Sequence, residues 1–126
     1  MKTSLEQVKV YTVSEITREI KQLLELNLPQ VWIEGEISNF ILATSGHRYF
    51  TLKDENAQIK AVLWRDIGDF LQFDLEDGIK VIALGTISVY EKQGQYQLYV
   101  EDVLPAGIGK LELAFRQLKE KLFNFV

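Results

Sequence analysis

Apolar residues recur at helical spacing near the start of the chain. The positions that step by three or four are Val13, Ile16, Ile20, Leu23 and Leu24. Thr12 and Glu15 have the spacing of a capping box, in which each side chain accepts a hydrogen bond from the other residue's backbone N–H. Pro29 follows and cannot continue a helix. The pattern therefore predicts an amphipathic helix over residues 13–27, closed by Asn27.

From Gln30 onward, apolar and polar positions alternate with a period of two, which predicts a half-buried strand. Gly35 lies inside this strand and predicts a bulge or a tight bend, as a curling sheet needs. Residues 43–46 are predicted to form a loop, residues 65–76 to hold a short helix or turn, and Pro105 to end the last strand. Helical spacing then returns and predicts a C-terminal amphipathic helix, with apolar residues at Ile108, Leu111, Phe115, Leu118 and Leu122.

Between these elements the pattern predicts a first hairpin. Its strands cover residues 47–54 and 57–64, with a two-residue turn at Glu55-Asn56. The resulting pairs are Leu52–Ile59, Phe50–Ala61, Thr51–Lys60, Tyr49–Val62 and His47–Trp64. One face is then apolar and the other is polar and aromatic, whereas a slip of one residue would mix the two faces.

A second hairpin is predicted to turn at Gln93-Gly94. This turn gives the pairs Val89–Leu98, Ile87–Val100, Tyr90–Gln97 and Ser88–Tyr99. Five strands with a helical link between the third and the fourth is the plan of the OB-fold, a small Greek-key barrel. We therefore predict a mainly β chain, with residues 1–28 as an N-terminal extension and helix, residues 29–105 as a five-stranded OB-fold barrel and residues 106–126 as a C-terminal helix.

Composition excludes several classes of function. The 126 residues carry 14 Lys+Arg against 18 Asp+Glu, a net charge of −4, and no cysteine. A chain without cysteine has no disulfide, thiol nucleophile or thiolate metal site. The acidic balance argues against strong, purely electrostatic binding to duplex DNA. Without a membrane-spanning run or the apolar block of a signal peptide, the protein is expected to be cytoplasmic.

The sequence contains few candidates for catalytic residues. His47 is the only histidine, and no nucleophile–base arrangement can be named around it. Its ordinary interpretation is a surface or hydrogen-bonding role, and its functional one is contact with nucleic acid. A group of acidic residues matches no calcium-loop spacing and consists of Asp66, Asp69, Asp74, Glu76 and Asp77. Phosphate-binding glycine motifs do not occur. From these three observations together, we expect no catalytic residue, no metal site and no cofactor in this chain.

The outer face of the first hairpin carries the stronger functional signal. His47, Tyr49, Lys60 and Trp64 fall on its non-core side, and Arg65 lies just beyond. Aromatic rings among cations suit single-stranded nucleic acid, because bases stack on the rings while Lys and Arg follow the phosphates. The alternative interpretation is that Tyr49 and Trp64 only cover the barrel beneath a terminal helix.

Several longer motifs resemble one known family. They are residues 11–16 (YTVSEI), 31–40 (VWIEGEISNF), 45–54 (SGHRYFTLKD), 57–59 (AQI), 89–98 (VYEKQGQYQL) and 107–111 (GIGKL). In this order they are similar to the N-terminal OB domain of the large subunit of exodeoxyribonuclease VII. The resemblance implies a module that holds single-stranded DNA for a nuclease. It also implies hydrolytic residues in a later domain, small subunits as partners and no requirement for a divalent metal.

The resemblance also implies which residues contact DNA. Carried over by position, these are Asn39, Ser45, His47, Tyr49, Tyr90, Lys92 and Gln97, to which charge and position add Arg48 and Arg65. Where the family continues toward its catalytic region, this chain closes with residues 123–126 (FNFV). We therefore expect the chain to bind DNA without cleaving it.

Two other functions fit the same sequence. One is an RNA-binding OB domain like the anticodon-reading domains of some tRNA synthetases, whose Phe-x-x-Leu-x-Asp strand looks similar. The other is a docking domain for assembly of nuclease subunits, in which the C-terminal helix supplies the contact and allows self-association.

Overall fold

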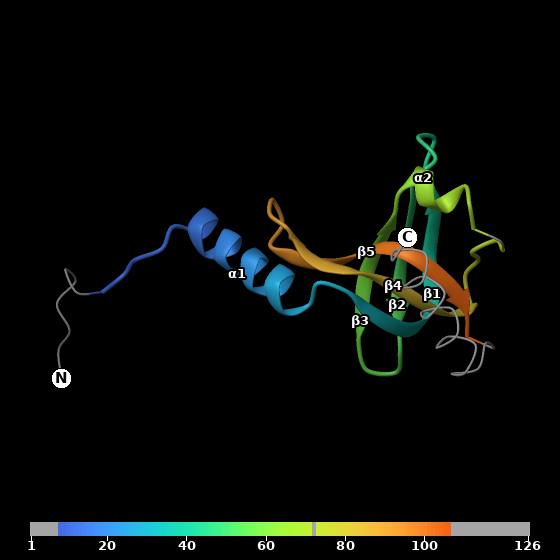
Figure 1. Ribbon diagram of the computed structural model, residues 1–126, viewed down its shortest axis with the longest axis horizontal. Coiled ribbons are helices and arrows are strands. Elements are labelled where there is room, and N and C mark those ends of the chain that lie inside the picture. The colour runs from blue at the N-terminus through green and yellow to red at the C-terminus, as the bar shows by residue number, and fades with distance from the viewer. Residues whose placement is uncertain (1–7, 72, 107–126) are drawn as a thin grey trace, which may run out of the picture.

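Five strands close into a barrel, and one helix lies beside it (Figure 1). The structure, a computed structural model, describes residues 8–71 and 73–106. Its elements are α1 (Val13–Asn27), β1 (Val31–Leu42), β2 (Arg48–Lys53), β3 (Gln58–Leu63), α2 (Arg65–Gly68), β4 (Lys80–Tyr90) and β5 (Gln95–Pro105). The C-terminal helix predicted from residues 108–122 lies outside the described residues.

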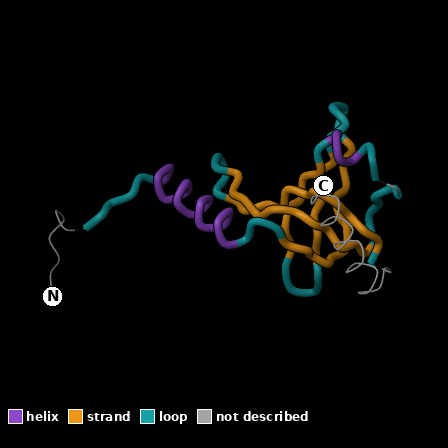
Figure 2. Tube along the Cα trace, viewed as in Figure 1, coloured by secondary structure: helices purple, strands orange, loops and turns teal. Residues whose placement is uncertain are grey.

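The barrel has the strand order β1-β2-β3-β5-β4, with β4 closing back onto β1. All neighbouring strands are antiparallel except β3 and β5, which are parallel. This is the order of the predicted OB-fold, and Figure 2 shows the short helix α2 between the third and fourth strands. Inward-facing apolar side chains fill the barrel, and the most deeply buried include Ile37, Leu52, Leu63, Leu98 and Val100.

β1 changes partners along its length, as a strand that closes a small barrel must. Its first half pairs with β4, from Val31 opposite Gly85 onward, and its second half pairs with β2. Gly35 lets β2 approach closely, because a Cβ at this position would lie 3.3 Å from the Leu52 Cβ. The bulge itself is not at Gly35. It lies between Ser38 and Ile41, where the register shifts.

The first hairpin has the predicted register. Leu52 lies opposite Ile59 and Tyr49 opposite Val62, and the backbone N–H of Asp54 donates to the Ala57 carbonyl at 3.0 Å. The turn therefore contains two residues. Phe50, Leu52, Ala61 and Leu63 face inward and are buried, so the sorting of the two faces that was predicted from the pattern is confirmed.

The second hairpin has a different register from the one predicted. Val89 lies opposite Tyr96 and Ile87 opposite Leu98, a shift of two residues. The reason is the turn, in which the Tyr90 carbonyl accepts the backbone N–H of both Gln93 and Gly94. Gly94 adopts a φ of +62°, so the chain turns through a longer loop that begins after Tyr90. A shift of two keeps the same side chains on each face.

α1 covers the predicted residues and begins with the predicted capping box. Polar contacts hold it against the β4–β5 hairpin: Ser88 Oγ donates to Glu25 Oε1 at 2.7 Å, and Lys21 Nζ lies 3.2 Å from Glu91 Oε1. Leu24 packs against the core cluster. Most of the other apolar side chains on the helix are exposed, among them Val13, Ile16, Ile20 and Leu23. In residues 8–71 and 73–106, no helix is long and apolar enough to cross a membrane.

Candidate nucleic-acid interface

The outer face of β2, β3 and β5 presents aromatic and cationic side chains. Because Phe50 and Ala61 point into the barrel, their neighbours Tyr49 and Lys60 point out. Tyr49 is 39% exposed and Trp64, directly after β3, is 42% exposed. Within the described residues, both rings are therefore on the surface.

Three rings form a cluster on this face, which we call the ring cluster: His47, Trp64 and Tyr99. The His47 and Trp64 centroids are 5.0 Å apart with an interplanar angle of 81°, an edge-on contact. Trp64 also lies beside Tyr99, with centroids 6.2 Å apart and planes inclined by 19°. These are favourable geometries for aromatic pairs. The cluster joins the start of β2, the end of β3 and the middle of β5.

Hydrogen bonds order the segment around His47. Its Nδ1 accepts the backbone N–H of Arg65 at 2.9 Å, and its own backbone N–H donates to Ser45 Oγ at 3.4 Å. The Gly46 N–H donates to the Ala43 carbonyl at 2.9 Å and closes the turn between β1 and β2. Gly46 has a φ of +91°, and the side chain of Arg65 occupies the space where a Cβ would be. The β1–β2 loop is thus packed directly against the residue that follows Trp64.

A polar row lies next to the ring cluster. Lys60 is opposite Thr51 on β2 and opposite Gln97 on β5. Gln97 in turn is opposite Ser88, whose hydroxyl is engaged by α1. Thr51 and Ser88 are buried, so Lys60 and Gln97 are the members of this row that reach the surface.

The structure does not bring Arg48 together with these residues. Arg48 is paired with Leu63 and shares the inward parity of Phe50, so it lies at the end of the barrel under α2. Its Nη1 donates to the Gly46 carbonyl at 3.1 Å and lies 3.5 Å from Asp69 Oδ1. The side chain is only 19% exposed. Arg48 thus connects α2 to the barrel.

Three further predicted residues lie at the margins of this face. Asn39 is exposed in the β1 bulge and has a φ of +53°. Tyr90 and Lys92 lie at the tip of the β4–β5 hairpin, which projects from the barrel alongside α1 (Figure 1). Both are exposed. A nucleic-acid strand that lies on the ring cluster would have to extend along β5 to reach Tyr90 and Lys92.

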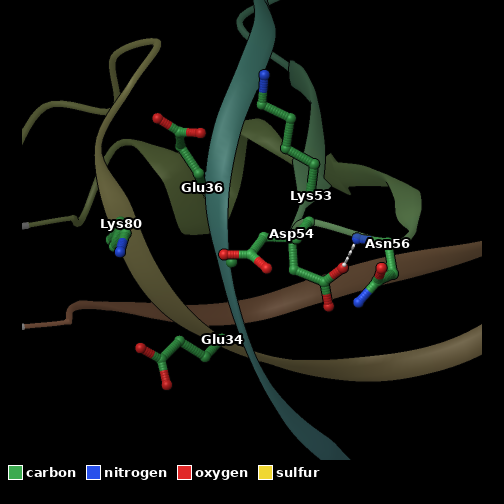
Figure 3. Close-up of a pocket in the computed structure, with 8 residues that line it drawn as sticks. Glu34, Glu36, Lys53, Asp54, Asn56 and Lys80 are labelled. Carbon is green, nitrogen blue, oxygen red and sulfur yellow. Dashed lines mark hydrogen bonds between the residues drawn. The ribbon is translucent and has the colours of Figure 1, made fainter.

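A hollow of about 740 Å³ opens elsewhere, beside the β2–β3 turn (Figure 3). Its charged lining combines four carboxylates with two lysines and consists of Glu34, Glu36, Asp54, Glu55, Lys53 and Lys80. The backbone N–H groups of Asn56 and Ala57 donate to Asp54 Oδ1 at 2.8 and 2.9 Å and hold the pKa of that carboxyl below its usual range. An acidic lining repels phosphate, so this hollow is not where the chain would hold a nucleic acid.

Two of the acidic residues after β3 have structural partners. Asp69 lies against Arg48, and Asp77 Oδ1 accepts the backbone N–H of Phe40 at 2.9 Å. Within the described part of the chain, no group of three or more His, Asp or Glu side chains is arranged to hold a metal ion.

Comparison with known proteins identifies the family of this chain. Residues 11–104 match a protein family described as an OB-fold nucleic acid binding domain. The chain belongs to this family. The match covers α1 and nearly the whole barrel, including the ring cluster and the polar row.

Longer proteins share this sequence. The chain is 53% identical over 116 residues to an exodeoxyribonuclease 7 large subunit from Halothermothrix orenii and 48% identical over 111 residues to one from Rhodopirellula baltica. These matches cover 90% and 88% of the chain, but only 29% and 25% of the relatives. The resemblance predicted from the motifs is confirmed, and the chain spans little more than a quarter of the length of these relatives.

Among solved structures, a replication protein A heterotrimer bound to single-stranded DNA has a chain with a TM-score of 0.52 and 19% identity. The alignment covers 71% of this chain and 66% of that one. An asparaginyl-tRNA synthetase from Pyrococcus horikoshii also has a TM-score of 0.52, with 16% identity over 71% of this chain and 22% of the synthetase. At these identities the two structures establish the shared fold.

Tyr99 is the residue of the ring cluster that the sequence analysis did not select. Its outward parity was part of the predicted second hairpin, which placed it opposite Ser88 on the non-core side. What the pattern did not reveal is the parallel pairing of β3 with β5, which sets Tyr99 opposite Val62 and beside Trp64. Parallel neighbours are distant in sequence, so no hairpin rule predicts them.

Proposed function

We propose that this chain binds single-stranded DNA across the outer face of β2, β3 and β5. In this proposal it is the N-terminal module of an exodeoxyribonuclease VII large subunit and presents the strand to a nuclease domain outside this chain. Residues 29–105 bind DNA, and residues 1–28 support the barrel. The chain itself does not hydrolyse DNA.

The observation that carries the proposal is the pair of exposed rings, Tyr49 and Trp64, beside cationic and amide side chains. Tyr49 and Trp64 offer ring surface to bases, and each stacked base contributes about 1–3 kcal/mol. Lys60 and Arg65 follow the phosphates. Further contacts come from the loops and from the polar row, through Asn39, Ser45, Tyr90, Lys92 and Gln97.

The comparisons support this proposal at two levels. The family is one of nucleic-acid-binding OB domains, and the relatives are named as large subunits of an exodeoxyribonuclease. The OB barrel of replication protein A shows that a chain of this fold takes part in a complex with single-stranded DNA. If the chain works as part of such a subunit, the small nuclease subunits are its expected partners in the longer protein.

Tryptophan fluorescence tests the proposal directly. A Trp32→Phe variant leaves Trp64 as the sole tryptophan, and it is titrated with a twelve-nucleotide oligo(dT) at several salt concentrations. Emission should change on binding, and affinity should fall as salt rises, because released counterions contribute to phosphate binding. Unchanged emission and no measurable affinity at low salt would reject the proposal.

A matched RNA oligonucleotide separates DNA binding from RNA binding. A site that reads the 2′-hydroxyl prefers RNA, whereas a ring-and-cation surface accepts DNA at least as well. Clear preference for oligo(U) over oligo(dT) would therefore move the function to the anticodon-reading type of domain.

The exposed apolar residues of α1 favour protein docking as a second candidate function. The partner in that case is another subunit or a second copy of the chain. Sedimentation analysis at micromolar concentration tests this role, since a chain that docks through such a surface should self-associate or bind the small subunit. A monomer that binds oligo(dT) alone would reject it.

A further inference from the structure

We infer that His47 is a positioning residue, which holds the Trp64 ring in place for the base that stacks on it. This inference rests on the proposed function, because it concerns the same surface. It assigns His47 a role through Trp64, in place of the direct DNA contact that the family resemblance implies. Two independent contacts of the imidazole carry the inference, one to the backbone beside Trp64 and one to the indole ring itself.

The first contact supplies a helix cap that the local sequence lacks. Trp64 is the N-cap residue of α2 and makes no side-chain capping hydrogen bond. The first backbone N–H groups of a helix have no partner within it, so they need an acceptor from elsewhere. His47 Nδ1 accepts the first of them, the N–H of Arg65, at 2.9 Å. An imidazole from the residue just before β2 thereby caps the turn that begins at Trp64.

This hydrogen bond fixes the backbone on the C-terminal side of Trp64. On the N-terminal side, Leu63 is already fixed by its pairing with Arg48 in the sheet. The indole therefore projects from a backbone that is held at both of its neighbours. Without the His47 cap, the segment after β3 would lose the tie between Arg65 and the β1–β2 loop.

The second contact restricts the ring. The imidazole and indole centroids lie 5.0 Å apart in an edge-on contact, and the Tyr99 ring is stacked with the indole at a centroid distance of 6.2 Å. A side chain that is already held loses less conformational freedom when a ligand binds, so preorganised rings bind more tightly. His47 thus raises affinity for a base on Trp64 even if no atom of His47 touches the DNA.

The hydrogen bond also distinguishes the two nitrogens of His47. Nδ1 is an acceptor, so in the neutral ring the proton is on Nε2. An asparagine places its amide oxygen near the position of Nδ1, whereas a glutamine places its terminal amide near that of Nε2. His47→Asn can therefore retain the cap on Arg65, and His47→Gln can retain a donor directed toward a ligand. The two variants separate positioning from direct contact.

A double-mutant cycle in affinity for a labelled oligo(dT) tests the inference, with the full chain in every case. Trp64→Ala should weaken binding by about 5- to 150-fold, the value of one lost stack. His47→Ala should weaken it by about 3- to 10-fold. If His47 acts through Trp64, the double variant should bind no more weakly than Trp64→Ala alone. Lys60→Ala, which removes a separate phosphate contact, should instead add its effect to that of Trp64→Ala.

The conservative variants provide the second arm. His47→Asn should recover most of the affinity lost in His47→Ala, and His47→Gln should not. In a Trp32→Phe background, His47→Ala should also make Trp64 more accessible to acrylamide quenching in the absence of DNA. Gln22→Ala on α1 is the control that should change neither affinity nor quenching. If His47→Ala does not fold, the comparison of the Asn and Gln variants decides alone.

Three results would overturn the inference: additive losses for His47→Ala and Trp64→Ala, recovery by His47→Gln but not by His47→Asn, or unchanged quenching of Trp64 in a folded His47→Ala variant. Each would make His47 a direct contact or a bystander. A Trp64→Ala variant that binds as tightly as the parent is a different failure. That result would count against the proposed ring surface and thus against the proposed function.

Discussion

The carboxylate of Asp77 holds the backbone of Phe40. Its Oδ1 accepts the Phe40 N–H at 2.9 Å, one residue after Asn39, which has a φ of +53°. Beside it, the Gly78 N–H donates to the Ile37 carbonyl at 2.8 Å, so the segment before β4 grips the bulge of β1. One of the acidic residues that match no calcium-loop spacing therefore shapes the edge of the candidate interface.

Asp77→Ala should lower the free energy of unfolding by about 1–2 kcal/mol, because it leaves the Phe40 N–H without its charged acceptor. Asp77→Asn keeps an acceptor oxygen and should lose less. Urea denaturation followed by circular dichroism measures both. Equal losses in the two variants would show that the charge, and not the acceptor, is what matters.

Substitutions at Asn39 distinguish the effect of backbone strain from the loss of a DNA contact. A left-handed backbone disfavours side chains with a Cβ, although Asn tolerates it, and glycine adopts it freely. Asn39→Gly should therefore leave the unfolding midpoint close to that of the parent, whereas Asn39→Ala should cost about 1 kcal/mol. If Asn39 contacts DNA as proposed, both variants should bind oligo(dT) more weakly. A fully stable Asn39→Gly variant with parental affinity would remove Asn39 from the interface.

Tyr99 should contribute to DNA binding, although it was not among the contacts predicted from the sequence. Its ring lies beside Trp64 on the same face, so Tyr99→Ala should weaken oligo(dT) binding by about 5-fold or more through a lost or misplaced stack. Tyr96→Ala is the matched control. Tyr96 is 59% exposed but lines an apolar pocket with Leu24 of α1, away from the ring cluster. Anisotropy titration of both variants gives the comparison, and equal losses would contradict the assigned face.

Gly85 is required by a close approach between strands. It lies at the register shift between β4 and β5, and a Cβ there would overlap the backbone carbonyl of Tyr99. Gly85→Ala should therefore lower stability by about 1–3 kcal/mol and should also displace Tyr99. Gly94→Asn is the control, because its turn is open and Asn tolerates positive φ. Thermal unfolding of the two variants should separate clearly, and similar midpoints would contradict this packing.

Asp54 should make the barrel less stable in acid. The hydrogen bond from the backbone N–H of Asn56 lowers its pKa most, and the one from Ala57 lowers it further. The ionised form is therefore favoured in the folded state. Such a group stabilises the fold above its unfolded pKa of about 3.9, and this contribution is lost as pH falls through the lower folded pKa. Asp54→Asn should therefore flatten the decline in urea midpoint below about pH 4. Glu55→Gln, a substitution in the same turn, should leave the decline unchanged.

How far the pattern predicts the fold depends on the kind of contact involved. The β2–β3 register was predicted because a slip of one residue would put Leu52 opposite Lys60. The β4–β5 register was wrong because a shift of two leaves every face unchanged, so parity cannot detect it. Only the geometry of the turn, in which Gly94 takes a positive φ, decides between the two.

The same reasoning explains what could be predicted of the candidate site. Tyr49, Lys60 and Trp64 were placed outward by parity alone, and the structure has them there. Arg48 was added for its charge although its parity matches that of Phe50, and it lies under α2. Local alternation therefore predicted the direction of a side chain better than charge did. The contact between Trp64 and Tyr99 depends on a parallel strand pair, which local alternation does not encode.

The closed barrel leaves β2, β3 and β5 without a free edge. A bound strand therefore cannot extend the sheet and has to lie on side chains that are already in place. Most of the ordering on binding then falls on the nucleic acid. Adenine tracts, which must first give up their own stacking, should bind more weakly than flexible thymine tracts of equal length.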